Sequence, residues 1–414
     1  GGHDREKLYS AFDLAIKTKG KPTVLLIKTV KGDGFEQMQG QNTAHQQKKI
    51  NIAQRAEFAK KYNIKLSPRE IANADFYKPE PTSEELKYML ERRKNLGGFI
   101  PQRLTSTKTI KLPNFLEFLS KLKSTKKRPT SSTSSAVKII NSLTKDNLIG
   151  KYIVPIIPDE ARTFGLETIF KEIGIYSQDG QNYTPVDIST LTPYRESKTG
   201  QVLQEGICET GAMCSFMAAG TAYSVHNTPM IPFYLFYSMF GFQRVGDLIW
   251  ACGDMLCKGF LLGGTAGRTT LNGEGLQHQD GHSHVIAETV PNLKSYDPAF
   301  DYELLVIIFD GIERMFIRQE NIFYYLTVYN QKYTMLDLPS LEEKADIIKG
   351  GYLLQEESNT LKNIETVNIL ASGPMVMEAL KASPKLVEIG FSVKIYSVTS
   401  FNELYRDALE AEQN

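Results

Sequence analysis

A segment rich in glycine and histidine, Gly263–His284, holds the densest group of side chains that could do chemistry. Three of the six histidines of the chain, His278, His282 and His284, lie there within seven residues. The spacing of His282 and His284 is typical of zinc ligands, but no cysteine is near and the surrounding residues favour a turn. Two other interpretations stay open: a substrate-facing loop with one histidine as general acid, or histidines held in structural hydrogen bonds.

Two pairs of carboxylates form the second group of candidates. Asp159 and Glu160 directly follow a short apolar run, and adjacent carboxylates at the end of a strand suit acid–base chemistry. The alternative is that they begin a helix and cap its backbone. Glu205 and Glu209 lie four residues apart in a predicted helix, Leu203–Ser224, that is rich in small residues. Glu209 is either exposed and without a role, or buried and paired, and a buried carboxylate can exchange protons near neutral pH.

The Gly-Asp-Gly turn at residues 32–34 is a third candidate. Such a turn after a strand can bind Mg²⁺ and a diphosphate when an asparagine further along the chain supplies another oxygen ligand. At the expected distance the sequence reads FAKKY, and Asn63 after it lacks the usual following partner. We therefore interpret the turn as one without a metal role. His45, alone among polar residues, would by itself be an exposed loop histidine.

Apolar runs bounded by turn residues alternate with helical patterns along most of the chain. Such runs are typical of strands in parallel sheets, because helices cover both faces of these sheets. The alternation therefore predicts an α/β fold with parallel sheets flanked by helices. The predicted strands are Thr23–Val30, Lys151–Ile157, Met230–Phe240, Gly259–Gly267, Leu304–Gly311, Tyr324–Asn330, Thr366–Gly373 and Phe391–Val398.

The composition limits the classes of function. With 48 Lys and Arg against 47 Asp and Glu, the net charge of +1 gives no electrostatic reason to expect nucleic acid or an acidic membrane surface as partner. No apolar run approaches the length of a membrane span. The cysteines form no CxxC pair, so we expect buried, reduced thiols and a reducing compartment, the cytoplasm. They are Cys208, Cys214, Cys252 and Cys257.

Five blocks of the sequence together point to a known family. These blocks are PDEARTFG, GQVLQEG, MIPFYLFYSMFGFQRVGDL, GGTAGRTTLNGEGLQHQDGHSH and YSVTSF. They closely resemble the homodimeric, bacterial-type thiamine-dependent pyruvate dehydrogenase component of the pyruvate dehydrogenase complex. The likeness runs through the whole chain without a large gap, so it does not rest on one short motif.

The resemblance implies a transketolase-like thiamine diphosphate-binding fold of three domains, of which the first and last are incomplete. Residues 1–104 would form the end of the diphosphate-binding domain with a mobile active-site loop. Residues 105–338 would form the pyrimidine-binding domain and residues 339–414 the start of the C-terminal domain. The resemblance also implies thiamine diphosphate and Mg²⁺ as cofactors, pyruvate as substrate, the lipoyl domain of dihydrolipoamide acetyltransferase as partner, and a homodimer.

Four residues of the expected pyrimidine-binding domain receive roles from the resemblance. Glu209 matches the glutamate that binds the aminopyrimidine ring nitrogen and so promotes formation of the reactive carbanion. Phe240 matches the aromatic residue that packs on this ring. Tyr237 and His278 match residues that position the substrate and its developing alkoxide.

Four further residues match positions near the cofactor or on the mobile loop. Asp159 and Glu160 match an acidic pair beside the cofactor. Lys31 matches an active-site lysine, and His45 matches the loop histidine that serves acetyl transfer to the lipoyl group. The metal-binding Gly-Asp-Gly turn of the family and its asparagine are expected before Gly1, so no metal ligand is assigned to this chain.

The leading hypothesis is therefore oxidative decarboxylation of pyruvate with reductive acetylation of a lipoyl domain, which feeds the synthesis of acetyl-CoA. A competing hypothesis is a truncated product without catalytic activity that acts at most as a binding or assembly remnant. Another 2-oxo acid as substrate is a weaker alternative, because Tyr237 and His278 stand in the pattern typical of pyruvate.

Overall fold

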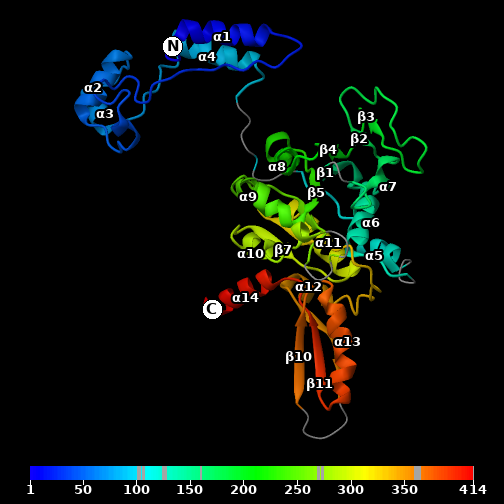
Figure 1. Cartoon of the computed structure of the whole chain (residues 1–414). Coiled ribbons are helices and arrows are strands. Elements are labelled where there is room, and N and C mark those ends of the chain that lie inside the picture. Colours follow the sequence, from blue (N-terminus) through cyan, green and yellow to red (C-terminus); the bar gives the residue numbers. More distant parts are fainter. Residues whose placement is uncertain are drawn as a thin grey trace. The chain divides into compact units, whose positions relative to one another are not determined.

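The computed structural model describes residues 1–99, 104, 108–123, 128–158, 161–267, 271, 275–358 and 365–413. The chain falls into two units, Gly1–Ile100 and Pro101–Asn414, whose elements are labelled in Figure 1. Across the described residues, no helix has both the length and the apolar character needed to cross a lipid bilayer.

The first unit is helical. Asn51 and Ser67 each begin a helix with a capping box, in which a side chain and the backbone of the first turn bond reciprocally. Among the described apolar side chains of this unit, Ala59 alone is classed as buried, so the unit has little core of its own. Its elements are α1 (Arg5–Lys17), the 3₁₀ helix η1 (Asn42–His45), α2 (Ile52–Lys61), α3 (Pro68–Asn73) and α4 (Glu84–Asn95).

The segment Thr23–Val30 is not the buried strand that its sequence predicts. It pairs with no strand among the described residues, and the side chains of Val24 and Leu26 are 80% and 95% exposed. The prediction was wrong because an apolar run becomes a buried parallel strand only where neighbouring strands accept its backbone bonds and helices cover its faces. The described part of this unit supplies no such sheet.

A six-stranded sheet forms the centre of the second unit, with strand order β4-β1-β5-β6-β8-β7. Every pairing in it is parallel, and β5, β6 and β8 are almost completely buried, as strands covered on both faces must be. The α/β prediction is confirmed. The strands are β1 (Ile153–Ile157), β4 (Leu203–Gln204), β5 (Ile231–Tyr237), β6 (Phe260–Gly264), β7 (Leu293–Tyr296) and β8 (Phe323–Thr327).

Two groups of helices cover this sheet. In one group, α9 packs against both α8 and α10. In the other group, α5, α6 and α11 pack against one another (Figure 1). A separate two-stranded sheet pairs β2 (Ile175–Tyr176) with β3 (Glu196–Ser197). The helices are α5 (Phe115–Lys123), α6 (Ser132–Thr144), η2 (Gly150–Tyr152), α7 (Glu167–Phe170), α8 (Glu209–His226), α9 (Ser238–Asp254), η3 (Leu276–His278), α10 (Ser283–Glu288) and α11 (Asp301–Phe316).

A smaller sheet lies in the C-terminal part of the second unit. Its order is β10-β11-β9, with β10 and β11 parallel and β9 antiparallel to β11. The predicted strands Thr366–Gly373 and Phe391–Val398 correspond to β10 and β11. The elements here are α12 (Glu343–Lys349), β9 (Tyr352–Glu357), β10 (Thr366–Ala371), α13 (Met375–Glu388), β11 (Ser392–Ser397) and α14 (Phe401–Gln413).

The predicted strand Leu304–Gly311 is wrong, because this run lies inside helix α11. A short apolar run cannot by itself distinguish a buried helix from a buried strand. The carboxylate of Glu303 caps the start of this helix. It accepts hydrogen bonds from the backbone N–H groups of Ala299 at 2.6 Å and Phe300 at 3.1 Å, so it satisfies donors that a helix start leaves free.

Two other predicted elements have different ends in the structure. Strand β5 ends at Tyr237, and helix α9 begins at the next residue, so the predicted strand Met230–Phe240 was too long. The predicted helix Leu203–Ser224 begins only at Glu209. Glu205 therefore lies before the helix, and the prediction that both glutamates belong to it was wrong.

All four cysteines are free thiols, but only Cys252 and Cys257 are buried. Cys208 and Cys214 are exposed, contrary to the prediction that all four would be buried. The sequence of helix α8 shows no distinct apolar face, so its pattern does not predict that Cys214 meets solvent.

Candidate active site

Glu209 is the first residue of helix α8 and lies at the end of the parallel sheet. A helix N-terminus stabilises a nearby carboxylate, because its unpaired N–H groups give it a partial positive charge. The Glu209 side chain is 16% exposed, and its backbone carbonyl accepts a hydrogen bond of 3.3 Å from the Tyr234 hydroxyl on β5. Of the two interpretations of Glu209, the structure supports the mostly buried and paired one.

The partner of Glu209 is Arg244 on α9, whose guanidinium forms an ion pair with the carboxylate. The same guanidinium carbon lies 4.1 Å from the centre of the Phe240 ring, a cation–π contact. Arg244 was not among the predicted site residues. The signal that could have found it is its position four residues after Phe240, since residues at this spacing meet on one face of a helix.

Three aromatic side chains form a cluster that contains Phe240. Tyr237 ends β5, Phe240 lies in the first turn of α9, and His278 comes from η3. The ring centres of Tyr237 and His278 are 4.5 Å apart, and those of Phe240 and His278 are 5.3 Å apart. Nδ1 of His278 is buried and has no hydrogen-bond partner among the described residues. The structure thus brings together four predicted residues: Glu209, Tyr237, Phe240 and His278.

The other two histidines of the glycine-rich segment have separate surroundings. His282 is exposed, and its backbone N–H donates to the Asp280 carboxylate at 3.0 Å. Burial alone would favour neutral Asp280, but hydrogen bonds from Ser283 and His282 outweigh it and lower the pKa of this carboxyl. Within the described ranges, no three His, Cys, Asp or Glu side chains are grouped so that they could hold a metal ion. Among these residues, His282 and His284 therefore have no third side chain that could complete a zinc site.

His284 belongs to a chain of partly buried hydrogen bonds. The Thr327 hydroxyl donates to Oδ1 of Asp297 at 2.6 Å, so Nε2–H of His284 is the donor in its 2.9 Å contact with Thr327. Burial lowers the pKa of His284 despite the carboxylates of Asp297 and Asp280. Of the open interpretations, the structural histidine fits His284.

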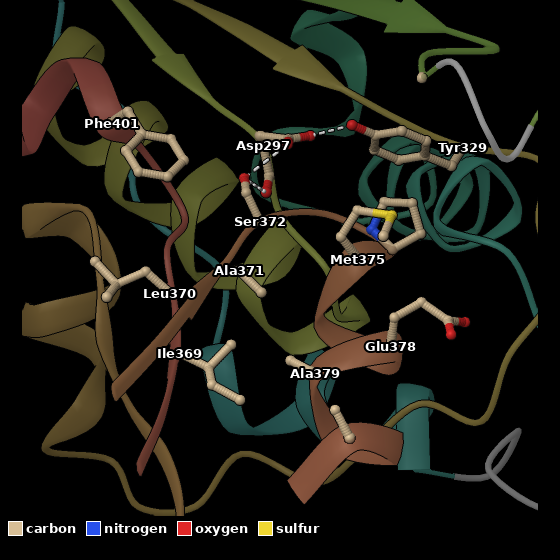
Figure 2. Close-up of a pocket in the computed structure, with 13 residues that line it drawn as sticks. Asp297, Tyr329, Ile369, Leu370, Ala371, Ser372, Met375, Glu378, Ala379 and Phe401 are labelled. Atoms are coloured by element: carbon tan, nitrogen blue, oxygen red, sulfur yellow. Dashed lines mark hydrogen bonds between the residues drawn. The ribbon is translucent and has the colours of Figure 1, made fainter. Parts of the chain in front are cut away.

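Asp297 lies where the two sheets of the second unit meet. It also accepts hydrogen bonds from the Tyr329 hydroxyl at 2.5 Å and the Ser372 hydroxyl at 2.7 Å, as Figure 2 shows. These groups line a cavity of about 550 Å³ beside β10 and α13. Because Thr327 lies on β8 of the large sheet and Ser372 directly follows β10 of the small one, the Asp297 carboxylate links the two sheets.

In the first unit, Lys31 and His45 are in contact. Nζ of Lys31 lies 2.6 Å from Nδ1 of His45, and both side chains are exposed. The sequence offered no reason, apart from the family resemblance, to connect these two residues, which lie 14 positions apart.

The Gly-Asp-Gly turn beside Lys31 has structural contacts. Asp33 accepts a hydrogen bond of 3.0 Å from the Tyr62 hydroxyl and lies 3.4 Å from Nδ1 of His3. A Cβ atom at Gly34 would come within 2.7 Å of the Tyr62 ring, and its φ is +92°. These contacts hold the turn in place, and the expectation that it has no metal role stays a prediction. Asp159 and Glu160 lie outside the described residues.

The comparisons with known proteins identify the family. The family model described as "Pyruvate dehydrogenase E1 component middle domain" matches residues 112–335, more than half of the chain. The chain belongs to the pyruvate dehydrogenase E1 component family. It is 49% identical over 414 residues to the pyruvate dehydrogenase E1 component of Pseudomonas aeruginosa, covering 100% of this chain and 47% of that relative.

Other relatives and solved structures agree with this family and its fold. The pyruvate dehydrogenase E1 component of Escherichia coli K12 is 46% identical over 417 residues, with 100% of this chain and 46% of the relative covered. The chain thus spans about half the length of the curated E1 relatives it matches. A transketolase structure from Campylobacter jejuni superposes with a TM-score of 0.67 at 18% identity, covering 98% of this chain and 56% of that one. The predicted family and the transketolase-like α/β fold are confirmed.

Proposed function

We propose that the chain is the part of a thiamine diphosphate-dependent pyruvate dehydrogenase E1 that holds the aminopyrimidine of the cofactor and the reacting pyruvate. The reaction would be the oxidative decarboxylation of pyruvate with reductive acetylation of the lipoyl group of dihydrolipoamide acetyltransferase. The observation that carries this proposal is the placement of the Glu209 carboxylate and the Phe240, Tyr237 and His278 rings in one cluster at the end of a parallel sheet. In open α/β folds, ligands bind at this end of the strands.

The chemistry of this cluster fits an aminopyrimidine. A mostly buried carboxylate can accept a hydrogen bond from a ring nitrogen, and the face of Phe240 offers a surface for stacking. Arg244 now contacts both groups, so it must move aside or turn for the pyrimidine to reach them. When bound, thiamine diphosphate supplies the electron sink for decarboxylation.

The remaining cluster residues act on pyruvate in this proposal. Nδ1 of His278, which has no described partner, can hydrogen-bond the oxygen on which charge develops. Tyr237 lies against His278 and packs on Phe164, with ring centres 5.3 Å apart, so neighbouring side chains hold its orientation. Asp159 and Glu160 are proposed as the acidic pair beside the cofactor, by resemblance alone.

Lys31 and His45 serve acetyl transfer in this proposal. The proposal assigns no Mg²⁺ ligand to this chain. The complete activity, the homodimer and the cytoplasmic location are proposed for a protein of the length of the relatives, which are about twice as long as this chain. The three-domain division at residues 104 and 338 stays a prediction.

A chimera tests the proposal. This chain replaces the corresponding residues of the Pseudomonas aeruginosa relative, to which it can be aligned over its whole length. We expect the chimera to release CO₂ from pyruvate and to acetylate an isolated lipoyl domain, measured by mass spectrometry. The parent relative is the positive control. A folded chimera that binds thiamine diphosphate but leaves pyruvate unchanged would overturn the proposal and favour the non-catalytic remnant.

A further inference from the structure

The contact between Lys31 and His45 determines which imidazole nitrogen carries the proton. An ammonium group has only donors, so Nδ1 of His45 accepts the 2.6 Å hydrogen bond from Lys31. A neutral imidazole that accepts at Nδ1 carries its proton on Nε2. No other described group bonds to this ring. Nε2–H is therefore left as a proton donor toward solvent or a ligand.

The loop formed by residues 31–40 brings the two residues together. The Gly40 N–H donates to the Lys31 carbonyl at 3.0 Å, so the two ends of this loop are hydrogen-bonded to each other. The 3₁₀ helix η1 then carries the chain from this point to His45. Gly32 has a φ of +78°, and a Cβ atom there would lie 3.3 Å from the Met38 carbonyl oxygen. The glycine thus permits the turn that starts the loop.

Among the described residues, no carboxylate competes with His45 for the Lys31 ammonium. The nearest carboxylate in sequence, Asp33, contacts Tyr62 and His3 instead. Within the described residues, no carboxylate forms an ion pair with Lys31 or His45, and Glu36 on the same loop forms none with them. Lys48 and Lys49, which follow His45, are exposed and add only positive charge.

We propose that Lys31 is a positioning residue that fixes the tautomer of His45 and replaces the proton that His45 gives away. This inference rests on the proposed acetyl transfer. In that step a carbon–sulfur bond forms with the electron pair of decarboxylated pyruvate, and the lipoyl S–S bond breaks. The departing sulfur keeps the S–S electron pair and takes the proton from Nε2 of His45. Nδ1 takes a proton from Lys31, so the imidazole stays neutral and the lysine, left as an amine, regains its proton from water.

Nitrogen NMR of the 414-residue chain, labelled with ¹⁵N-histidine, tests the positioning. The six histidines give few signals, and His45→Gln identifies the signal of interest. The tautomer ratio is read from the neutral imidazole, in which only one ring nitrogen carries a proton. We expect Lys31→Met to lower the ratio of the Nε2–H to the Nδ1–H form about fivefold, the effect of one ordinary hydrogen bond. The matched control Lys48→Met removes the same charge and should leave the ratio unchanged.

Lys31→Arg separates positioning from proton supply. Arginine can donate a hydrogen bond but does not lose a proton in proteins. It should therefore restore the tautomer ratio in the NMR experiment. In the chimera it should still slow lipoyl acetylation by about a hundredfold, the size of a general-acid contribution.

An unchanged tautomer ratio in Lys31→Met, or an equal change in Lys48→Met, overturns the inference whatever the chimera does. Wild-type rates of lipoyl acetylation in Lys31→Arg overturn the proton-supply part. Failure of the unsubstituted chimera to acetylate the lipoyl domain, by contrast, counts against the proposed function. The two hypotheses can thus fail independently.

Discussion

Arg244 pairs with the Glu209 carboxylate and at the same time lies over the ring of Phe240, with its guanidinium carbon 4.1 Å from the ring centre. One cation therefore contacts both groups to which the proposed function assigns the aminopyrimidine. The arginine side chain is 48% exposed, whereas that of Glu209 is only 16% exposed. The arginine can thus turn toward solvent, while the carboxylate stays fixed at the start of its helix.

Removing Arg244 should destabilise the second unit slightly. We expect Arg244→Met to lower the free energy of unfolding by about 1 kcal/mol, because a half-exposed ion pair and a cation–π contact are lost. Trp250, the one tryptophan of the chain, lies on the same helix and reports urea unfolding by fluorescence. Arg318→Met is the control, since Arg318 forms an exposed ion pair with Glu313. Equal losses in the two variants would show that the contact with Phe240 adds nothing.

Glu209 should be far more important for catalysis than its neighbouring carboxylate. In the chimera, we expect Glu209→Ala to reduce CO₂ release from pyruvate by about a hundredfold or more, the usual contribution of a positioned proton-transfer group. Glu205→Ala is the matched control. Glu205 accepts a hydrogen bond from the Ser215 hydroxyl and has no assigned role. Undiminished decarboxylation in Glu209→Ala would contradict the proposal that Glu209 binds the aminopyrimidine.

The parallel sheet was predictable, while the ends of its elements were not. Strands such as Gly259–Gly267 show long apolar runs because both their faces are covered, and β6 lies inside this range. Leu304–Gly311 carries an equally apolar run but lies in a helix, whose start is capped by Glu303, a residue just outside the run. Thr23–Val30 has strand character, but the described residues of its unit form no sheet that it could join. The local sequence pattern thus shows that a segment is apolar, but the neighbouring residues and elements determine whether it forms a strand or a helix.

The site was predictable only through long sequence blocks. Glu209, Tyr237, Phe240 and His278 come from four elements. No spacing rule connects Glu209 or His278 with the neighbouring pair Tyr237 and Phe240, because they lie far apart in sequence. Arg244 was missed because a polar residue on a helix is by default a solvated one. Its contact with Glu209 depends on the packing of α9 against α8, which becomes known only in three dimensions.

His284 should make the chain less stable in mild acid. Its folded-state pKa is lowered by burial, so below a pH of about 6.5 the unfolded chain binds a proton that the folded chain does not. The free energy of unfolding should then fall by up to about 1.4 kcal/mol per pH unit. His284→Gln should reduce this slope, and His226→Gln, at an exposed site, should keep it. Urea unfolding at several pH values measures the slopes, and identical slopes in all three proteins would contradict the assignment.

Lys258 should make the chain more stable in mild base, a pH dependence of the same sign as that of His284. It is fully buried, and burial lowers its pKa to about 8. Above this pH the folded chain releases a proton that the unfolded chain keeps until about 10.5, so the free energy of unfolding should rise with pH in this range. Lys258→Met should abolish the rise, whereas Lys332→Met at the surface should retain it. A rise that survives in Lys258→Met would have another origin.

The exposed segment Thr23–Val30 affects how copies of the chain meet in concentrated solution. An extended apolar segment without a partner strand is a template on which a second copy can pair. Lys19 and Lys21 precede it, and Lys28 interrupts it. Like charges in these positions oppose this pairing, because it would bring the lysines of two copies close together. Salt screens this repulsion, so the colloidal stability of the chain should depend on ionic strength more than its net charge of +1 suggests.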